Sequence, residues 1–405
     1  MKRAQRWFLS IVFSWIGFLP LHASAQSVPI DDTPFPLLAG LEPAVEFWKK
    51  IFTEYSISQI VFFDPLEMSR IYEVLDVGEE NRSNEYVNGE RERIAAAHEV
   101  EIDRVKAQRG VKERTAAGLK RSNRYIAQMQ QIFRDRGLPV ELTYLPLIES
   151  SFNINARSHA GALGMWQFMP ATGRQYMQVN RAIDERKDPI ESTRAAAAFL
   201  KQAYDLLGKW PLAITAYNFG PAGMARAVAE VGSDNLVDVI QKYSHPHFGY
   251  PPKNFYAEFL AAVDIAKNSD QYFPGLDLDP PVAIKEVELS SKSSLAAVMR
   301  STGLKRDEFM QWNPALLNAP KIIPAGYRVK LPAQREMAAI VEVREEKETP
   351  ARLQQSSVVR HRVQRGETVV QIAKRYGSSA DRILRINGLR KANLRVGSTL
   401  LVPRM

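Results

Sequence analysis

Glu149 is the carboxyl group of this 405-residue chain whose setting best suits acid catalysis. It directly follows the apolar pair Leu147-Ile148 and shortly precedes Phe152, so free solvation of its side chain is not expected. An apolar setting disfavours the carboxylate and raises the pKa of a carboxyl group. A carboxyl group that keeps its proton near neutral pH can act as a general acid. Taken alone, this pattern also fits a glutamate at a helix edge.

Three later segments strengthen the case for a site around Glu149. Residues 161–170 read Gly-Ala-Leu-Gly-Met-Trp-Gln-Phe-Met-Pro, residues 216–220 read Ala-Tyr-Asn-Phe-Gly, and residues 254–256 read Asn-Phe-Tyr. Amide and hydroxyl groups at helix ends can hydrogen-bond sugar hydroxyl and acetamido groups, and Trp and Tyr offer faces to sugar rings. The combination indicates a saccharide site.

The order and spacing of these segments resemble the soluble lytic transglycosylases, a family with a lysozyme-like α fold. The resemblance implies that Glu149 protonates a glycosidic oxygen and then accepts the proton of the muramic acid O6 hydroxyl, which closes a 1,6-anhydro ring. It also implies substrate contacts, which are assigned to Ser150, Gly164, Met165, Gln167, Tyr217, Asn218 and Tyr256. Of these, Tyr256 is expected to orient Glu149. For Ser150, Met165 and Phe219, capping or packing is an equally supported interpretation.

A hydrolase with two carboxylates needs a partner for Glu149. The candidates considered are Glu141, Asp184, Glu185 and Asp188. Glu141 lies eight residues earlier, which is about 12 Å along a helix and too far for a nucleophile. The other three read as a loop and a helix start, where acidic residues cap. A lone catalytic acid favours the transglycosylase over a muramidase-type hydrolase, and the intact Glu149 argues against a third alternative, a non-catalytic peptidoglycan-binding protein.

The predicted fold is mainly α. Residues 26–130 are expected to form an N-terminal helical region in which the aromatic residues of 43–58 pack in the core. Residues 131–275 are expected to form the lysozyme-like catalytic domain, because helical runs alternate there with short Gly, Pro and Asn breaks and no alternating strand pattern is found.

Two small β-α-α-β units are predicted at the C-terminal end, at 281–333 and 359–405, with a charged linker at 334–357. Each has an asparagine at its centre, Asn313 or Asn387. The second unit resembles a LysM domain, whose family binds N-acetylglucosamine-containing glycans; the first is a degenerate copy. The matching groove residues are Gly366, Glu367, Thr368, Asn387, Gly388 and Leu389. The alternative is that Gly366 and Asn387 only build turns.

Residues 1–25 are expected to be a secretory signal, with a basic start, an apolar run and Ala23-Ser24-Ala25 as the cleavage site. The alternative is an uncleaved membrane anchor. The mature chain is therefore placed in the periplasm. The net charge of +9 lies entirely in the last 47 residues, which hold 11 Lys and Arg against 2 acidic residues. Since export disfavours nucleic acid, this basic tail favours peripheral association with the membrane or the anionic sacculus.

The chain has no cysteine, which excludes disulfides, thiolate metal sites and a thiol nucleophile. His245 and His247 are the one close histidine pair, and the proline between them indicates a loop. No metal and no cofactor is expected. The expected partner is the glycan strand of peptidoglycan, and the chain is expected to be a monomer.

Overall fold

The computed structural model describes residues 33–78, 83–317, 320–338, 340, 358–387, 389 and 394–403. The predicted signal at 1–25 and most of the predicted linker at 334–357 lie outside these residues. The chain divides into two compact units. The first contains the chain up to Lys285 together with 307–320 and 330–334, and the second contains 286–306, 321–329 and the residues from 335 onward.

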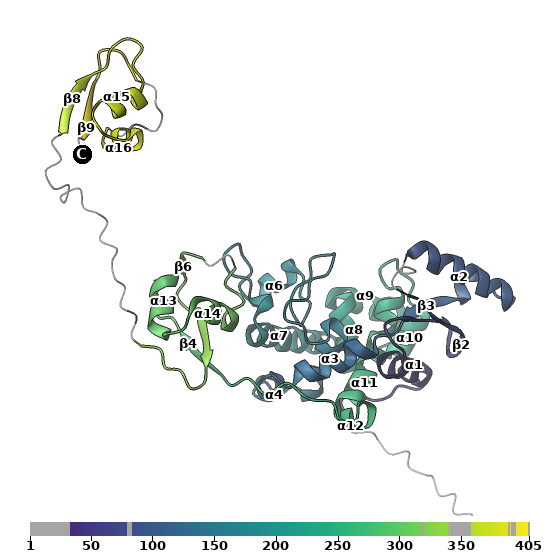
Figure 1. Ribbon diagram of the computed structural model, residues 1–405. Helices are drawn as coiled ribbons and strands as arrows, with labels where there is room; N and C mark the ends of the chain where they lie inside the picture. Colours follow the sequence, from purple (N-terminus) through teal and green to yellow (C-terminus); the bar gives the residue numbers. More distant parts are fainter. Residues whose placement is uncertain are drawn as a thin grey trace, which may run out of the picture. The chain divides into compact units, whose positions relative to one another are not determined.

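The first unit is built mainly from helices, which confirms the mainly α prediction (Figure 1). The helices before residue 280 are α1 Glu42–Thr53, α2 Asn84–Ala97, α3 Lys112–Ser122, α4 Ile126–Arg134, α5 Leu145–Ser150, α6 Pro170–Tyr176, α7 Pro189–Leu207, α8 Trp210–Phe219, α9 Pro221–Val231, α10 Leu236–Lys242, α11 Tyr250–Lys267 and α12 Ser269–Tyr272. None of the described helices is long and apolar enough to cross a membrane.

Local sequence sets the ends of the longest helix, α7. The Asp188 side chain accepts hydrogen bonds from the backbone N–H groups of Ile190 and Glu191, and Pro189 occupies the first turn, where its missing N–H costs nothing. Gly208 ends the helix at φ +71°, in the left-handed region that glycine adopts without strain. The acidic run at 184–188 is therefore explained in part by helix capping, as its sequence indicates.

The N-terminal region contains a sheet that the sequence analysis missed. Strand β1 (Gln59–Asp64) lies between β2 (Glu67–Asp76) and β3 (Lys106–Arg109), antiparallel to both. The region over 26–130 that is predicted to be helical therefore contains three strands as well as its helices. β1 is apolar on both faces, since Val61 and Phe63 join the main core while Ile60 and Phe62 join a smaller one under α2. A short strand buried on both sides has no alternating pattern by which to recognise it.

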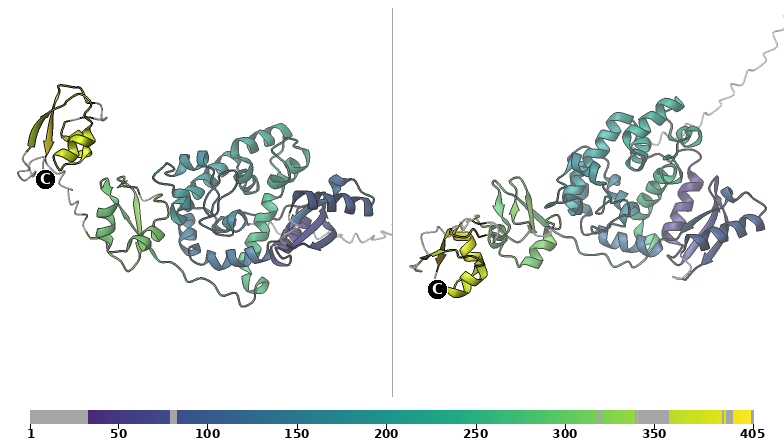
Figure 2. Two further views of the ribbon diagram at one scale, coloured as in Figure 1. Left: turned by 45° about the horizontal axis from the view of Figure 1, so that its top comes forward. Right: turned by 90° about the horizontal axis from the view of Figure 1, so that it is seen from above.

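One apolar core joins the N-terminal region to the helices that follow. It runs from Phe35 to Phe273 and includes the aromatic residues of α1, as predicted. Helix α1 packs against α11 (Figures 1 and 2), and the Trp48 Nε1 donates to Asn254 Oδ1 at 3.3 Å. The rings of Phe35 and Phe259 meet edge to face at 5.1 Å. The predicted boundary near residue 130 is thus not a boundary between compact units.

The two C-terminal modules repeat one arrangement, as predicted. The elements of the first are β4 Ile284–Glu288, β5 Ser293–Ser294, α13 Leu295–Thr302, α14 Arg306–Trp312, β6 Ile322–Ile323 and β7 Arg328–Pro332. Those of the second are β8 Val358–Arg362, α15 Val369–Arg375, α16 Ala380–Ile386 and β9 Thr399–Pro403, with β8 and β9 antiparallel. The second module has its own apolar core, which includes Val363, Ile372, Ile383 and Val402.

The central asparagine makes equivalent hydrogen bonds in each module. Its side chain donates to a helix carbonyl and to a carbonyl of the last strand, and it accepts from the strand N–H. In the first module Asn313 contacts Phe309 O at 3.0 Å, Lys330 O at 3.0 Å and Lys330 N at 2.9 Å. In the second, Asn387 contacts Ile383 O at 2.7 Å, Leu401 O at 2.8 Å and Leu401 N at 2.8 Å. The same hydrogen bonds therefore join the second helix to the last strand in both modules.

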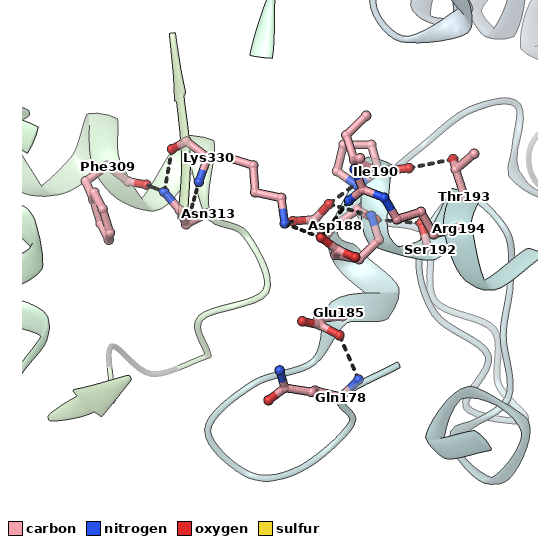
Figure 3. A network of polar contacts seen from close by, with 12 residues as sticks. Gln178, Glu185, Asp188, Ile190, Ser192, Thr193, Arg194, Phe309, Asn313 and Lys330 are labelled. Atoms are coloured by element: carbon pink, nitrogen blue, oxygen red, sulfur yellow. Dashed lines mark hydrogen bonds and ion pairs between the residues drawn. The ribbon is translucent and has the colours of Figure 1, made fainter. Parts of the chain in front are cut away.

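Lys330 on β7 is a buried charge that ties this strand to α7 within the first unit (Figure 3). Its side chain is 2% exposed, and its Nζ lies 3.0 Å from Asp188 Oδ2 and 2.8 Å from Glu191 Oε1. Backbone bonds reinforce the contact, since the Asp184 N–H donates to Ala315 O at 2.8 Å. Asp188 therefore both caps α7 and pairs with the buried cation, which Glu191 contacts as well.

We expect Lys330→Ala to lower the free energy of unfolding by about 3–5 kcal/mol, because it removes the cation paired with the buried carboxylate of Asp188 and one of the two cations paired with Glu191. Urea unfolding followed by circular dichroism measures this change. Lys305→Ala, at an exposed lysine in the same module, is the matched control and should change stability by less than about 0.5 kcal/mol. Equal effects of the two substitutions would contradict the assigned role of Lys330.

Candidate active site

Glu149 stands in the last turn of α5, a six-residue helix. Pro146 starts the helix, and the chain leaves it abruptly because Ser151 and Phe152 both have positive φ, at 52° and 57°. Left-handed backbone at consecutive non-glycine residues is strained and occurs mostly at functional sites. Because the chain turns away directly after Ser150, Glu149 lies at the very end of the helix.

Glu149 lines a cleft of about 550 Å³ whose walls come from distant parts of the chain. Trp48 and Phe52 come from α1, Gln108 from β3, and Glu258 from α11. Three arginines, Arg114, Arg121 and Arg157, also line it. The cleft is therefore shared between the N-terminal region and the helices that follow. Its size and its polar lining suit a polar ligand.

The carboxyl group of Glu149 has no hydrogen-bond or ion-pair partner among the described residues. Burial raises its pKa to about 8, because a low-dielectric setting disfavours the charged form. Glu149 is therefore protonated at neutral pH, as the sequence analysis predicts. A protonated carboxyl group at the wall of an open cleft can donate its proton to a bound ligand.

Ser150 and Gln167 line the same cleft and hold its walls together. The Ser150 hydroxyl donates to Met165 O at 2.8 Å, which joins α5 to the 161–170 segment. Gln167 has a φ of +51°, and its Nε2 donates to Gly164 O at 2.7 Å and Ala156 O at 3.3 Å. These two predicted residues therefore stand where the sequence analysis placed them, beside Glu149.

Gly164 is required by a close approach of two backbone segments. Its φ is +81°, and a Cβ atom there would lie 1.7 Å from the Arg186 carbonyl oxygen. The Arg186 side chain pairs with Asp184 at 2.7 Å and donates to Gly161 O and Phe168 O, both at 3.0 Å. The glycine thus lets the 161–170 segment lie directly on the residues that lead into α7.

Tyr217 lies close enough to Glu149 to sense its charge. Burial raises the pKa of Tyr217, and the negative charge of Glu149 adds to the rise. The Tyr217 hydroxyl donates to Trp166 O at 2.8 Å, so the ring is held between α8 and the 161–170 segment. Tyr217 therefore supports the wall beside Glu149 and keeps its own proton.

Five predicted substrate contacts lie outside the cleft-lining residues, and one of them is Tyr217, which supports the wall beside Glu149. Gly164 and Met165 are buried, Met165 with 1% exposure. Tyr256 is fully buried, and its hydroxyl donates to Pro36 O at 2.9 Å. Packing turns Tyr256 toward the core of the unit, and its expected role in orienting Glu149 stays a prediction. Asn218 is exposed at the end of α8 and does not line the cleft.

Glu258 is an acidic cleft residue that the sequence analysis missed. It lies two positions after Tyr256 on α11 and is the one charged residue between Lys253 and Asp264. Its neighbours Phe255, Ala257 and Phe259 are buried. An acidic residue inside so apolar a helical run was the available signal, but its distance from the other motifs hid its relation to Glu149.

The carboxylates that the sequence analysis rejected as partners of Glu149 all lie outside the cleft-lining residues. Glu141 pairs with Lys267 at 2.7 Å, and Asp184 pairs with Arg186. Asp188 belongs to the Lys330 network. Burial raises the pKa of Glu185 to about 7, and its Oε2 accepts from the Gln178 N–H. These contacts support the rejection of the four carboxylates as partners of Glu149. Glu149 is nevertheless not the lone acid of the cleft, because Glu258 also lines it.

The predicted groove residues of the second module mostly build its scaffold. Glu367 accepts from Gln364 N at 2.9 Å, lies 2.7 Å from His361 Nε2 and pairs with Arg375 at 2.6 Å. These bonds lower the pKa of Glu367 to about 2. Thr368 caps α15 in a reciprocal capping box with Gln371.

The remaining groove predictions have similar local roles. Gly366 has a φ of +87° in the turn before α15. The Leu389 N–H donates to Leu384 O, and its side chain packs on the module core. Gly388 lies outside the described residues. In the part of the chain that the structure describes, no group of three or more His, Asp and Glu side chains is arranged to hold a metal ion.

Comparison with known proteins gives two matches to domain families. Residues 126–237 match the transglycosylase SLT domain and residues 361–403 match the LysM domain. The chain is similar to membrane-bound lytic murein transglycosylase D of Escherichia coli (strain K12), with 30% identity over 284 residues that cover 66% of this chain. The chain spans 61% of that relative's length.

Two further proteins are similar over shorter stretches. A putative tributyltin chloride resistance protein of Alteromonas sp. (strain M-1) is 31% identical over 170 residues, which cover 42% of this chain and 80% of that protein. The solved structure of a lytic transglycosylase Slt from Pseudomonas aeruginosa has 22% identity and a TM-score of 0.30, and the match covers 38% of this chain and 25% of that chain.

We expect Gly164→Ala to destabilise the protein by about 3 kcal/mol or more, because its Cβ would overlap the Arg186 carbonyl and force the backbone apart. Gly161→Ala is the matched control: its φ is also positive, at +93°, but no atom lies within 4 Å of the added Cβ. It should cost only the backbone strain of about 1–2 kcal/mol. Thermal unfolding of both variants checks this, and equal losses would contradict it.

Proposed function

We propose that this chain cleaves peptidoglycan glycan strands between N-acetylmuramic acid and N-acetylglucosamine. The premise is that it belongs to the family that joins a transglycosylase SLT domain to a C-terminal LysM domain. The proposal depends above all on Glu149, an unpaired carboxyl group that is protonated at neutral pH and lines an open cleft. This is the group that cleavage of a glycosidic bond by general acid catalysis requires.

The proposed reaction uses Glu149 twice. Its carboxyl group donates a proton to the glycosidic oxygen as the bond from that oxygen to C1 of the muramic acid breaks. The resulting carboxylate then accepts the proton of the C6 hydroxyl as O6 forms a bond to C1. The product is a 1,6-anhydromuramic acid end, no water is consumed, and Glu149 regains its starting protonation state.

Glu258 makes a muramidase-type hydrolase the second candidate, because a two-carboxylate mechanism needs a second acidic group in the cleft. In that mechanism the second group must be ionised to act as a nucleophile or a base. Burial raises the pKa of Glu258 to about 8, so at neutral pH it is protonated and poorly suited to either role. This protonation state favours the transglycosylase.

The location and the LysM domain fit the same substrate. We propose that the chain acts in the periplasm, and that its LysM domain binds the glycan strand on which the cleft acts. A tethered binding module raises the effective concentration of the polymer at the cleft. The basic charge of the last 47 residues adds attraction to the anionic sacculus, which salt would weaken.

We expect the mature protein to release muropeptides that are lighter by one water than reducing-end products, because O6 rather than water attacks C1. Mass spectrometry of the material released from purified sacculi measures this. Glu149→Gln should lower the rate at least a hundredfold by removing the acid, while Glu230→Gln, at an exposed position on α9, should not.

Each other outcome contradicts part of the proposal. Reducing-end products would identify a hydrolase. Sacculus binding without any release would identify a non-catalytic binding protein, the third alternative. Full activity of Glu149→Gln would remove Glu149 from the reaction.

Cleavage should fall as the pH rises through about 8, because Glu149 must carry its proton to act and its pKa lies near that value. The sign follows from the raised pKa: the active, protonated form is fully populated below it and is lost above it. A profile of kcat/KM between pH 5 and 10, with soluble glycan fragments as substrate, checks this limit. A fall centred near pH 4–5, the ordinary range of glutamate, would contradict it.

A further inference from the structure

The cleft contains a second carboxyl group, and it belongs to a residue outside the SLT match. Glu258 lies on α11, beyond the matched residues 126–237. Helix α11 packs against α5, which carries Glu149, and both glutamates line the same cleft. Two helices that are far apart in sequence therefore bring two acidic side chains to one cavity.

Glu258 has no neutralising partner. No described residue forms a hydrogen bond or an ion pair with its carboxyl group, although the side chain is half-buried. An acidic residue kept for stability is normally paired when it is removed from water, as Glu141 is with Lys267 of the same helix α11. Stability alone therefore does not account for a glutamate at this position.

The two carboxyl groups sense each other. Burial raises the pKa of Glu258 to about 8, and the charge of Glu149 contributes to the rise. Burial likewise raises the pKa of Glu149 to about 8. Electrostatic coupling is reciprocal, so two such groups lose their protons as a pair, in two steps that belong to both.

The other titratable groups around the pair do not neutralise it. None of the cations among them forms an ion pair with Glu149 or Glu258 in the described residues. Arg121 is committed to Ser151 O, and Lys106 lies 4.6 Å above the ring of Tyr250, whose pKa burial and the charge of Glu258 both raise. These groups are Arg114, Arg121 and Arg157 along the cleft, Tyr217 of α8 beside Glu149, and Tyr250 and Lys106 beside α11.

We propose that Glu258 is a positioning residue for cleavage, a proton-holding partner that limits the two carboxyl groups of the cleft to one negative charge and so keeps the acid proton available on Glu149. This inference rests on the proposed function. When Glu149 gives its proton to the glycosidic oxygen, Glu258 stays protonated and adds no second charge. When Glu149 takes the C6 hydroxyl proton back, Glu258 is unchanged, so the cycle gains and loses no proton.

The proposed role of Glu258 predicts how activity changes above neutral pH, where the pair of carboxyl groups has lost one proton. In the wild-type protein that single charge is shared, so part of the population keeps Glu149 protonated and active. Glu258→Gln keeps the size of the side chain but cannot take the charge. The alkaline limit of kcat/KM should then move to lower pH by about one unit, the effect of one nearby like charge, while activity near pH 6 remains.

The conservative variant and the control make the test specific. Glu258→Asp restores a carboxyl group and should return the alkaline limit toward the wild-type value. Glu230→Gln removes an exposed carboxylate on α9 and should leave the limit unchanged. An unchanged limit in Glu258→Gln overturns the proposal. Loss of activity at every pH in a folded Glu258→Gln protein also overturns it, because Glu258 would then carry a chemical step of its own.

A second readout separates this inference from the proposed function. The carboxyl ¹³C resonance of Glu149, followed by NMR titration, reports its protonation without turnover. Its midpoint should fall in Glu258→Gln and not in Glu230→Gln. If wild-type protein released no anhydro products yet the midpoint fell, the proposed function would fail and the coupling would stand. If anhydro products formed but the midpoint did not move, only the inference about Glu258 would fail.

Discussion

The structure of the catalytic unit is organised around the removal of water from one carboxyl group at the end of a very short helix. Glu149 can hold its proton because α5 is wedged among apolar segments and because the chain turns away through two left-handed residues immediately afterwards. The surrounding contacts maintain this setting. Ser150 ties α5 to the 161–170 segment, and that segment is fixed in turn by Arg186 and by the Tyr217 hydroxyl.

The wall opposite the SLT motifs comes from the residues that flank the SLT domain on both sides. Strand β3 and helices α1, α3 and α11 supply side chains to the cleft, and one continuous core joins these elements to the central helices. The N-terminal region is therefore part of the catalytic unit. Because Trp48 contacts both the cleft and Asn254, the same packing that stabilises the unit also shapes the volume available to a ligand.

The two C-terminal modules share one scaffold but differ in the contacts that their charged residues make. Asn313 and Asn387 join helix to strand in the same way, so this residue is explained by folding and need not contact glycan. Lys330 distinguishes the first module, since it is buried against Asp188 and Glu191 and commits that strand to the catalytic unit. In the second module, Glu367 is held by three partners, and its expected contact with glycan stays a prediction.

The sequence by itself determined the chemistry-bearing motifs, the ends of α7 and the repeated modules, because these depend on residues close together along the chain. Asp188-Pro189 and Gly208 define α7 through local capping and backbone preference, and the surroundings of Glu149 already indicated a raised pKa. Only the tertiary structure decided which side chains of α11 meet the cleft. The packing of α11 buries Tyr256, whose hydroxyl donates to Pro36 O, and places Glu258 in the same cleft as Glu149, since the orientation of a helix with apolar residues all around it is set by its neighbours.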